Sequence, residues 1–304
     1  MQQSVSVLLM SYNHEKLIEE AIKSVFIQKE YIKDIELIVL DDGSSDNTPD
    51  ILRRMQRDSP IKMNVIFNKH EGVTSIARNM LNLIKLSSNK YIAMLAADDS
   101  YVPNRFKKQI DILEKNLNCQ IVYGNGTNIR NGEVAGLVVR PKEVELMKAL
   151  DPCAIFNFVT SAPPQIYLQA ALAKRSFLEN VIPFDDDLVA DDWVFNIKVF
   201  RYLCNNKLDF GYLDESFFNR NLLDTSTSNN HYHHFNRVAG VAVRYLDVKN
   251  RKFYLRFYLG YIKAFLKKKD FNSAWKISKR FFLLILGSSK HNIKLGELIP
   301  IKDI

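Results

Sequence analysis

Short apolar runs and amphipathic segments alternate along the first hundred residues. Runs that are apolar at nearly every position are typical of strands buried on both faces of a sheet. The predicted strands cover 5–10, 35–40, 63–67 and 91–95. Apolar residues at helical spacing predict helices over 17–26, 48–57 and 73–86, with Asn13 and Thr48 as caps of the first two. This alternation predicts an α/β fold with a mostly parallel, doubly wound sheet.

The pattern becomes less regular after a fourth helix, which we expect from Pro103 to about Asn116. A short strand is expected at 121–123, and the Asn131-Gly132 pair predicts a tight hairpin. Residues 141–180 hold four prolines among apolar pieces. We therefore expect an irregular region that shapes an acceptor pocket.

Polar clusters follow three of the predicted strands. These clusters are Ser11-Tyr12-Asn13, Asp41-Asp42 and Asp98-Asp99. The carboxyl ends of parallel strands lie at one edge of a sheet, where ligands bind, so we expect the clusters to gather there. Adjacent buried carboxylates are costly unless a cation neutralises them, and a divalent ion holding a diphosphate would do so. The alternative is an acidic segment that only caps the next helix.

The chain from residue 237 onward is predicted to be helical, aromatic and basic. Formal net charge is +8, yet residues 249–294 hold thirteen Lys and Arg against the single acid Asp270. A basic amphipathic helix pair suits an anionic membrane surface. The alternative is a helical cap whose charges face water, and no nucleic-acid-binding motif accompanies the charge.

The composition describes a globular chain. With 304 residues and 47% hydrophobic content, it can bury a large core and form about two domains. Its three cysteines are odd in number and widely spaced, so we expect no disulfide framework and a reducing cytosol. A secretion signal and an apolar run of about 20 residues are not expected. Phosphate-binding glycine motifs of the dinucleotide and P-loop kinds are absent from the sequence.

In order and spacing, motifs across residues 4–117 resemble the inverting glycosyltransferases of family 2, which have the GT-A fold. The motifs are Val5–Asn13, Glu36–Asp46, Gly72–Asn79 with Ala77-Arg78-Asn79, and Asp98-Asp99. The resemblance implies a GT-A domain over 1–235, with a nucleotide-sugar half (1–117) and an acceptor half (118–235). Residues 236–304 would form a basic, aromatic helical extension.

The resemblance also implies roles for single residues in binding a UDP-sugar. Tyr12 would pack near the uracil, Asp42 would accept from a base N–H, and Arg78 would lie beside the base and diphosphate. Asp98 would reach the ribose, and Asp99 would bind Mg²⁺ or Mn²⁺ directly, with Asp98 as a second ligand. The residues expected to contact the nucleotide are Ser11, Tyr12, Asn13, Asp42, Arg78, Asp98 and Arg220.

Structural alternatives exist for several of these residues. Tyr12 is alternatively an aromatic at a strand end, and Arg78 a partner of a surface acid. Asp41 is expected to serve the turn at Gly43. One position departs from the family pattern, because Ala96 stands where many members carry a further acid. The remaining pair still suits Mg²⁺ or Mn²⁺, since such ions accept one or two carboxylates plus phosphate oxygens.

A second acidic pair, Asp191-Asp192, precedes an amphipathic helix. In the family such a pair supplies the general base, so the resemblance implies Asp192 as base and Asp191 in support. An N-cap is the plain alternative. Family members often carry a His two residues after the arginine that matches Arg220, where this chain has Leu222. The nearby histidines are either metal ligands or a surface cluster; they are His231, His233 and His234.

The sequence therefore predicts a cytoplasmic glycosyltransferase, peripheral on the inner face of the plasma membrane if its basic tail contacts lipid. It would move a sugar from a UDP-sugar to a hydroxyl of a glycan or lipid-linked glycan, with Mg²⁺ or Mn²⁺ and inversion at the anomeric carbon. Two alternatives stay open. One is a sugar-nucleotide-binding partner without turnover, and the other is a nucleotidyltransferase.

Overall fold

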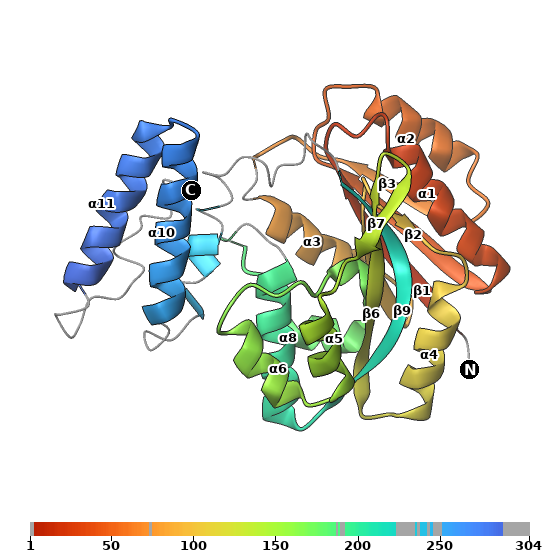
Figure 1. Cartoon of the computed structure of the whole chain (residues 1–304). Coiled ribbons are helices and arrows are strands. Elements are labelled where there is room, and N and C mark those ends of the chain that lie inside the picture. Colours follow the sequence, from red (N-terminus) through yellow and green to blue (C-terminus); the bar gives the residue numbers. More distant parts are fainter. Residues whose placement is uncertain are drawn as a thin grey trace. The chain divides into compact units, whose positions relative to one another are not determined.

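The computed structural model describes residues 3–72, 75–186, 188, 192–222, 235, 238–241, 244–245 and 251–287, with only the backbone of 251–255, 280 and 283–287 (Figure 1). The chain forms two compact units. Unit 1 is Met1–Phe156 with Pro164–Leu223, and unit 2 is Asn157–Pro163 with Asp224–Ile304. The domain boundary at residue 235 stays a proposal.

Four parallel strands form the first half of the sheet in unit 1. They are β1 (Ser4–Ser11), β2 (Asp34–Asp41), β3 (Lys62–Phe67) and β4 (Tyr91–Ala96), in the order β3-β2-β1-β4. β1, β2 and β4 are buried at nearly every position because helices cover both faces. β3 is more exposed, since it pairs on one side only. The predicted α/β fold is confirmed.

Helices connect these strands. They are α1 (Ile18–Phe26), the 3-10 turn η1 (Ile27–Glu30), α2 (Thr48–Arg57) and α3 (Ser75–Leu86). α1 and α2 lie on one side of the sheet and α3 on the other, which is the doubly wound arrangement (Figure 1). α1 buries its apolar stripe, including Ile18, Ile22 and Val25, against the core.

The two predicted helix caps are wrong. Leu17 occupies the N-cap position of α1, while Asn13 has φ 56° and bonds to the loop after β2 instead. Thr48 is the first residue of α2, and its Oγ1 accepts from the His14 N–H at 2.9 Å. Both polar side chains therefore tie two loops together rather than cap a helix, a long-range use that local propensity cannot predict.

The second half of the sheet is mixed. Its strands are β5 (Ser100–Tyr101), β6 (Cys119–Arg130), β7 (Glu133–Leu137), β8 (Leu172–Lys174) and β9 (Asp209–Asn221), and α4 (Arg105–Lys115) precedes β6. The sheet order continues β4-β8-β6-β9-β5, with β7 paired to β6. β6 is longer than the strand expected at 121–123. The hairpin at Asn131-Gly132 is confirmed, with φ 52° and 81° at its two residues.

The expectation of an irregular region over 141–180 is wrong. This region and the segment after it hold α5 (Pro141–Lys148), α6 (Pro152–Val159), the 3-10 turn η2 (Leu168–Ala170), β8, α7 (Arg175–Val181) and α8 (Asp192–Asn206). Pro141 stands in the first turn of α5, where its missing N–H costs no hydrogen bond. Pro141 and Pro152 thus mark helix starts, whereas Pro163 and Pro164 lie in the loop before η2.

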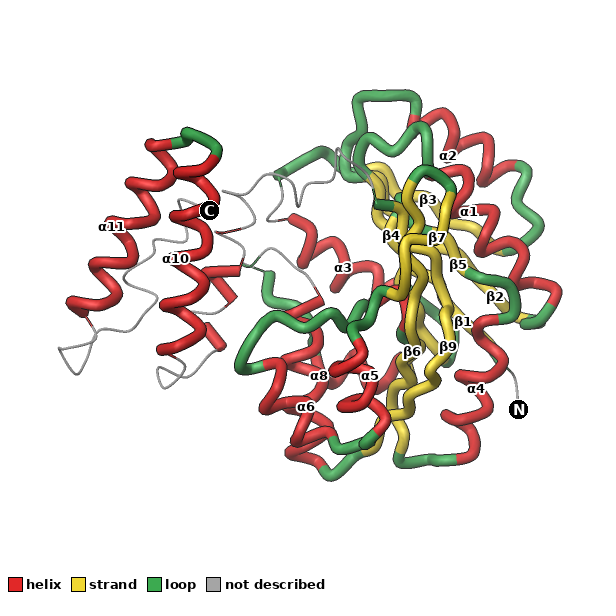
Figure 2. Tube along the Cα trace, viewed as in Figure 1, coloured by secondary structure: helices red, strands yellow, loops and turns green. Residues whose placement is uncertain are grey.

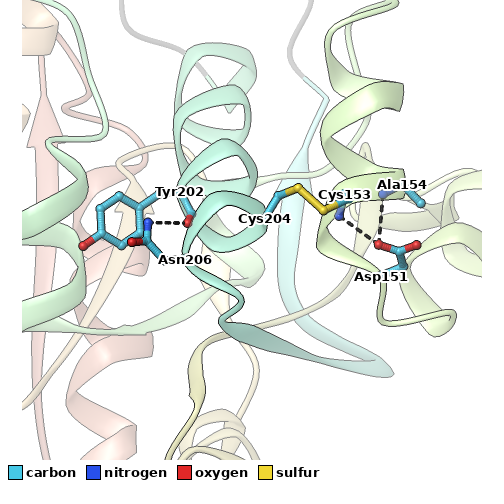
Figure 3. The surroundings of a disulfide bond; sticks show 6 residues. All are labelled: Asp151, Cys153, Ala154, Tyr202, Cys204 and Asn206. Atoms are coloured by element: carbon cyan, nitrogen blue, oxygen red, sulfur yellow. Dashed lines mark hydrogen bonds between the residues drawn. A yellow bond between two sulfur atoms is a disulfide. The ribbon is translucent and has the colours of Figure 1, made fainter.

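A disulfide joins α6 to α8 through Cys153 and Cys204, across 51 residues of sequence (Figure 3). Asp151 Oδ1 accepts from the N–H groups of Cys153 and Ala154 at 2.9 and 3.1 Å, which fixes the start of α6. The expectation of a chain without a disulfide framework did not include this bond. An odd count of widely spaced cysteines leaves room for one long-range bond beside the buried free Cys119.

Unit 2 contains α10 (Arg251–Lys267) and α11 (Phe271–Gly287), which pack on each other (Figure 2). Tyr258 and Phe265 of α10 and Ile277 of α11 are buried. Phe235 stacks on Phe257 with ring centroids 5.1 Å apart. The aromatic residues here thus build a small core of their own. None of the helices in the described ranges combines the length and apolar character of a membrane span.

Gly43 allows a close approach between two loops of unit 1. Its φ is +76°, and a Cβ there would lie 2.6 Å from the backbone N of His70. Gly132 has a similar φ of +81° with open space around it. We expect Gly43→Ala to cost clearly more than the roughly 1–2 kcal/mol of a left-handed residue, which Gly132→Ala should show alone. Urea unfolding of the two variants measures this, and equal losses would contradict the clash.

Candidate functional site

The polar clusters predicted to gather do lie at one edge of the sheet. Ser11 is in register with Asp41, and Met10 with Ala96, so the loops after β1, β2 and β4 begin side by side. His14 lies among them: burial lowers its pKa, and the nearby charges of Asp98, Asp46 and Asp41 act in the opposite direction. The buried Ser11 hydroxyl lies 3.4 Å from His14 Nδ1. Parallel topology thus brings these clusters into one electrostatic neighbourhood.

The loop after β2 is held by its own polar side chains. Asp41 accepts from the Ser44 N–H at 3.0 Å and from its hydroxyl at 2.5 Å, which confirms the structural role expected at the turn. The Asn13 N–H donates to Ser44 Oγ at 2.8 Å, and Asn13 Oδ1 accepts from the Ser45 N–H at 2.8 Å. Asn13 therefore braces this loop against the end of β1.

Asp42 is 4% exposed, and His70 lies between its carboxylate and the Tyr12 ring. His70 Nδ1 lies 2.8 Å from Asp42 Oδ2, and the His70 ring stacks on Tyr12 with centroids 4.2 Å apart. Asn79 Nδ2 donates to Asp42 Oδ1 at 2.9 Å, and the Ser75 hydroxyl lies 3.4 Å away. The Asp42 carboxylate is fixed, and a half-exposed aromatic face stands next to it.

Arg78 is exposed and forms an ion pair with Glu71. This is the structural alternative foreseen for that residue. A surface pair of this kind contributes little stability, so Arg78 can exchange partners at small cost.

Asp99 is the more deeply buried acid of the Asp98-Asp99 pair, at 4% exposure. Its Oδ1 accepts from the Asn221 N–H at 3.1 Å, and Gln169 Nε2 lies 3.4 Å from Oδ2. Burial raises its pKa well above the ordinary value, helped by the charges of Asp98 and Asp192 and opposed by Asn221 and Arg220. An ionised Asp99 thus favours a neighbouring cation.

Asp192 begins α8 and lies close enough to Asp99 for its charge to act on that pKa. Its Oδ1 accepts from the Leu168 N–H at 2.6 Å. The Arg220 guanidinium sits 4.9 Å from the centre of the Tyr167 ring and also acts on Asp99. Asp98 contributes its backbone oxygen to Asn221 Nδ2 at 2.6 Å. The end of β9 and the turn η2 therefore complete the site around Asp99.

The residues at this edge fit a divalent cation held partly by substrate. In the described ranges, no three His, Cys, Asp or Glu side chains form a ready-made metal cage. Mg²⁺ and Mn²⁺ do not require one, because one or two carboxylates plus phosphate oxygens suffice. Asp99, whose two oxygens meet only neutral N–H donors among the described residues, supplies such a carboxylate, and Asp98 is adjacent.

Several predicted residues lie outside the described ranges. They are Asp191, His231, His233 and His234.

Sequence reasoning missed five residues of the site: His14, His70, Tyr167, Gln169 and Asn221. His70 follows β3 as Tyr12 follows β1, so the same strand-end rule could have found it. Tyr167 and Gln169 carried no such signal, because their positions depend on how the η2 turn packs on strands far away in the sequence.

Comparison with known proteins shows the family. Residues 6–156 match Glycosyl transferase family 2. The glucosyltransferase WfgD of Escherichia coli, named as UDP-Glc:alpha-D-GlcNAc-diphosphoundecaprenol beta-1,3-glucosyltransferase, is 36% identical over 151 residues, covering 50% of this chain and 56% of that protein. Chondroitin synthase of Escherichia coli is 30% identical over 125 residues, covering 41% and 17%. The chain thus matches little more than half of the first relative's length.

Solved structures share the fold. S. aureus TarS 1–349 in complex with UDP-GlcNAc matches with a TM-score of 0.61 at 16% identity, covering 92% of this chain and 81% of that one. The mannosyltransferase PcManGT from Pyrobaculum calidifontis, in complex with GDP-Man and Mn²⁺, matches with a TM-score of 0.60, also at 16% identity, covering 97% and 77%. The match over residues 6–156 makes this chain a member of glycosyl transferase family 2, and its GT-A type architecture agrees with this.

Proposed function

We propose that this protein transfers a sugar from a UDP-sugar to a hydroxyl of a glycan or lipid-linked glycan, assisted by Mg²⁺ or Mn²⁺. The observation that carries the proposal is the buried Asp99 carboxylate with Asp192 and Arg220 acting on it, at the strand edge that also bears Tyr12 and Asp42. The UDP-sugar donor is supported by the names of the matched WfgD and TarS proteins. The Mn²⁺ complex of PcManGT supports a metal.

The proposed chemistry needs few groups. Asp192 takes the proton of the acceptor hydroxyl as that oxygen attacks the anomeric carbon. Arg220 stabilises the negative charge that develops on the departing diphosphate. A divalent ion bound through Asp99, with Asp98 beside it, would supply further positive charge there. One displacement inverts the anomeric centre, so an α-linked donor gives a β-glycoside.

Tyr12 and Asp42 would receive the base. Tyr12 is 42% exposed and its ring stacks on His70, which leaves an aromatic surface for the uracil. Asp42 is already held by His70 and Asn79, so a base N–H would be an additional donor to a carboxylate that has room for about four. Arg78 would leave Glu71 for the diphosphate.

A second candidate is a sugar-nucleotide-binding partner without turnover. Ala96 favours this candidate, because many family members carry a further acid at that position. That protein would bind UDP yet release none from any donor and acceptor. A nucleotidyltransferase would instead release pyrophosphate from a nucleoside triphosphate.

We further propose that unit 2 binds an anionic membrane surface, where a lipid-linked acceptor would lie. Phe271, Trp275 and Phe282 of α11 expose 66, 65 and 64% of their surfaces. At about 100° per residue they fall within roughly 40° around the helix, on a face that differs from that of the buried Ala274 and Ile277. This aromatic stripe is not used in the core of unit 2.

Cations accompany the aromatic stripe. Lys279 Nζ lies 5.6 Å from the centre of the Trp275 ring. On α10, the exposed residues Arg256, Lys263 and Lys267 follow one line at spacings of seven and four residues. Each such cation near an anionic leaflet contributes about 1 kcal/mol, and the aromatic rings suit the interface. A cytoplasmic location belongs to this proposal, although the disulfide removes the cysteine argument for it.

Loss of the proposed base should stop transfer and spare donor binding. We expect Asp192→Asn to keep UDP affinity within about twofold and to lower turnover by roughly 10²–10⁴, the usual contribution of a general base. A UDP-release assay across donors and an acceptor mixture measures turnover, and calorimetry measures UDP binding. Asp186→Asn, at an exposed acid in the same segment, is the control. Full activity of Asp192→Asn would exclude that residue as the base.

Metal-dependent binding should require Asp99. We expect UDP to bind the wild type at least about tenfold more tightly with MnCl₂ than with EDTA, and Asp99→Ala to lose that difference. Calorimetry under both conditions measures it for each protein. Equal UDP affinity of the wild type with and without manganese would rule out a metal that bridges Asp99 and the diphosphate.

Membrane binding should depend on the aromatic stripe. The wild type should float with vesicles of phosphatidylglycerol and phosphatidylcholine and not with phosphatidylcholine alone. The triple variant Phe271→Ser, Trp275→Ser, Phe282→Ser should stay at the bottom of the gradient. Leu117→Ser, at a site that is 78% exposed in unit 1, is the matched control. Flotation of the triple variant at the wild-type level would refute the stripe as the contact.

A further inference from the structure

We propose that the turn formed by residues 167–171 sets the positions of Asp99 and Asp192 relative to each other. The positioning groups are the backbone N–H of Leu168 and the side chain of Gln169. This inference rests on the proposed function, in which these two acids serve the metal and the attacking hydroxyl. It adds a physical link between two acids that lie far apart in the sequence.

The first contact of the turn is to the proposed base. The Leu168 N–H donates to Asp192 Oδ1 at 2.6 Å, and an ionised acceptor makes such a bond short and strong. The Asp192 backbone oxygen accepts from Asn196 Nδ2 at 2.7 Å, and the same amide donates to the Ile166 oxygen at 2.8 Å. The start of α8 is therefore fastened to the segment that leads into the turn.

The second contact is to Asp99. Gln169 Nε2 lies 3.4 Å from Asp99 Oδ2, while Asn221 N–H holds Oδ1. Gln169 Oε1 is buried and has no hydrogen-bond partner among the described residues. A buried amide with one open acceptor is costly unless the site uses it, so Gln169 is placed for Asp99 rather than for general packing.

The turn itself is held by the buried cation Arg105. Arg105 is 1% exposed and donates to the backbone oxygens of Gln169 and of Ala171, the latter at 2.9 Å. Burial lowers its pKa to about 10, so it remains a cation at neutral pH. Gln109 Nε2 donates to the Ala170 oxygen at 2.9 Å. Three successive carbonyl groups of the turn are thus held.

The Arg105 guanidinium is packed against aromatic rings. Its central carbon lies 4.1 Å from the centre of the Tyr101 ring and 4.8 Å from that of Phe106. Rings and carbonyl oxygens together compensate for the water that the cation has lost. The turn is therefore a rigid bridge, and a misplacement of about 1 Å between reacting groups can cost about 10²-fold in rate.

A proline removes the first contact and little else. Tyr167 has φ −104° and ψ 140°, which suits a residue before proline, and Leu168 opens η2, where a fixed φ is tolerated. We expect Leu168→Pro to lower kcat by roughly 10–100-fold. Its affinity for UDP with Mn²⁺ should stay within about twofold. Leu168→Ala keeps the N–H and should match the wild type in both measurements.

The second contact is removed by Gln169→Leu, which keeps the shape and loses the donor. We expect the affinity for UDP with Mn²⁺ to fall by roughly 10–100-fold, as for other groups that orient a metal ligand. UDP binding in EDTA should be unchanged. Gln165→Leu, the same substitution earlier in the same loop, is the control. Calorimetry measures UDP binding of both variants, with Mn²⁺ and in EDTA.

The two variants thus separate binding from turnover. The inference is overturned if Gln169→Leu binds UDP and Mn²⁺ as the wild type does, or if Leu168→Pro loses binding as strongly as turnover, since that would mean general disruption. Melting temperatures of all variants report folding. If the proline variant does not fold, the comparison of Gln169→Leu with Gln165→Leu still tests the inference. A wild type that binds UDP and Mn²⁺ but never releases UDP would refute the proposed function, while the Gln169 titration would still test the turn.

Discussion

The site depends on the burial of one carboxylate. Asp99 is 4% exposed, and burial raises its pKa because the charged form has lost its water. The donors on its two oxygens are neutral N–H groups of Asn221 and Gln169, which stabilise a negative charge only in part. A cation that arrives with the substrate would complete this balance. The surrounding elements, β4, β9 and the η2 turn, are arranged so that such a cation would meet Asp99 at the sheet edge.

Parallel topology makes the rest of the site possible. Because β2, β1 and β4 are neighbours with their carboxyl ends aligned, three loops meet without long connections. The loops are then fixed by side chains reaching across: Asn13 to the loop after β2, and His70 between Asp42 and Tyr12. The proposed acceptor side differs, since its parts come from η2, α8 and β9, which the mixed half of the sheet brings together.

The sequence predicted the structure well where the local spacing of hydrophobic residues determines a strand or helix. Strands buried on both faces appear as apolar runs, so β1, β2 and β4 were predictable, as was the meeting of the loops after them at one edge of the sheet. Contacts between distant segments were not. Asn13 and Thr48 have the chemistry of caps, yet they bond across loops, and Cys153 meets Cys204 only because α6 packs near α8. The η2 turn has no hydrophobic periodicity in its sequence. Its position depends on tertiary contacts, so it could not be predicted.

A crystal structure of the wild type with UDP and MnCl₂, with anomalous diffraction to locate manganese, tests whether Asp99 binds a metal that arrives with the nucleotide. We expect an anomalous peak at coordination distance from an Asp99 oxygen, with the diphosphate on the far side of the metal and the uracil against Tyr12. Manganese bound elsewhere, or UDP bound away from the carboxyl ends of β1, β2 and β4, would contradict it.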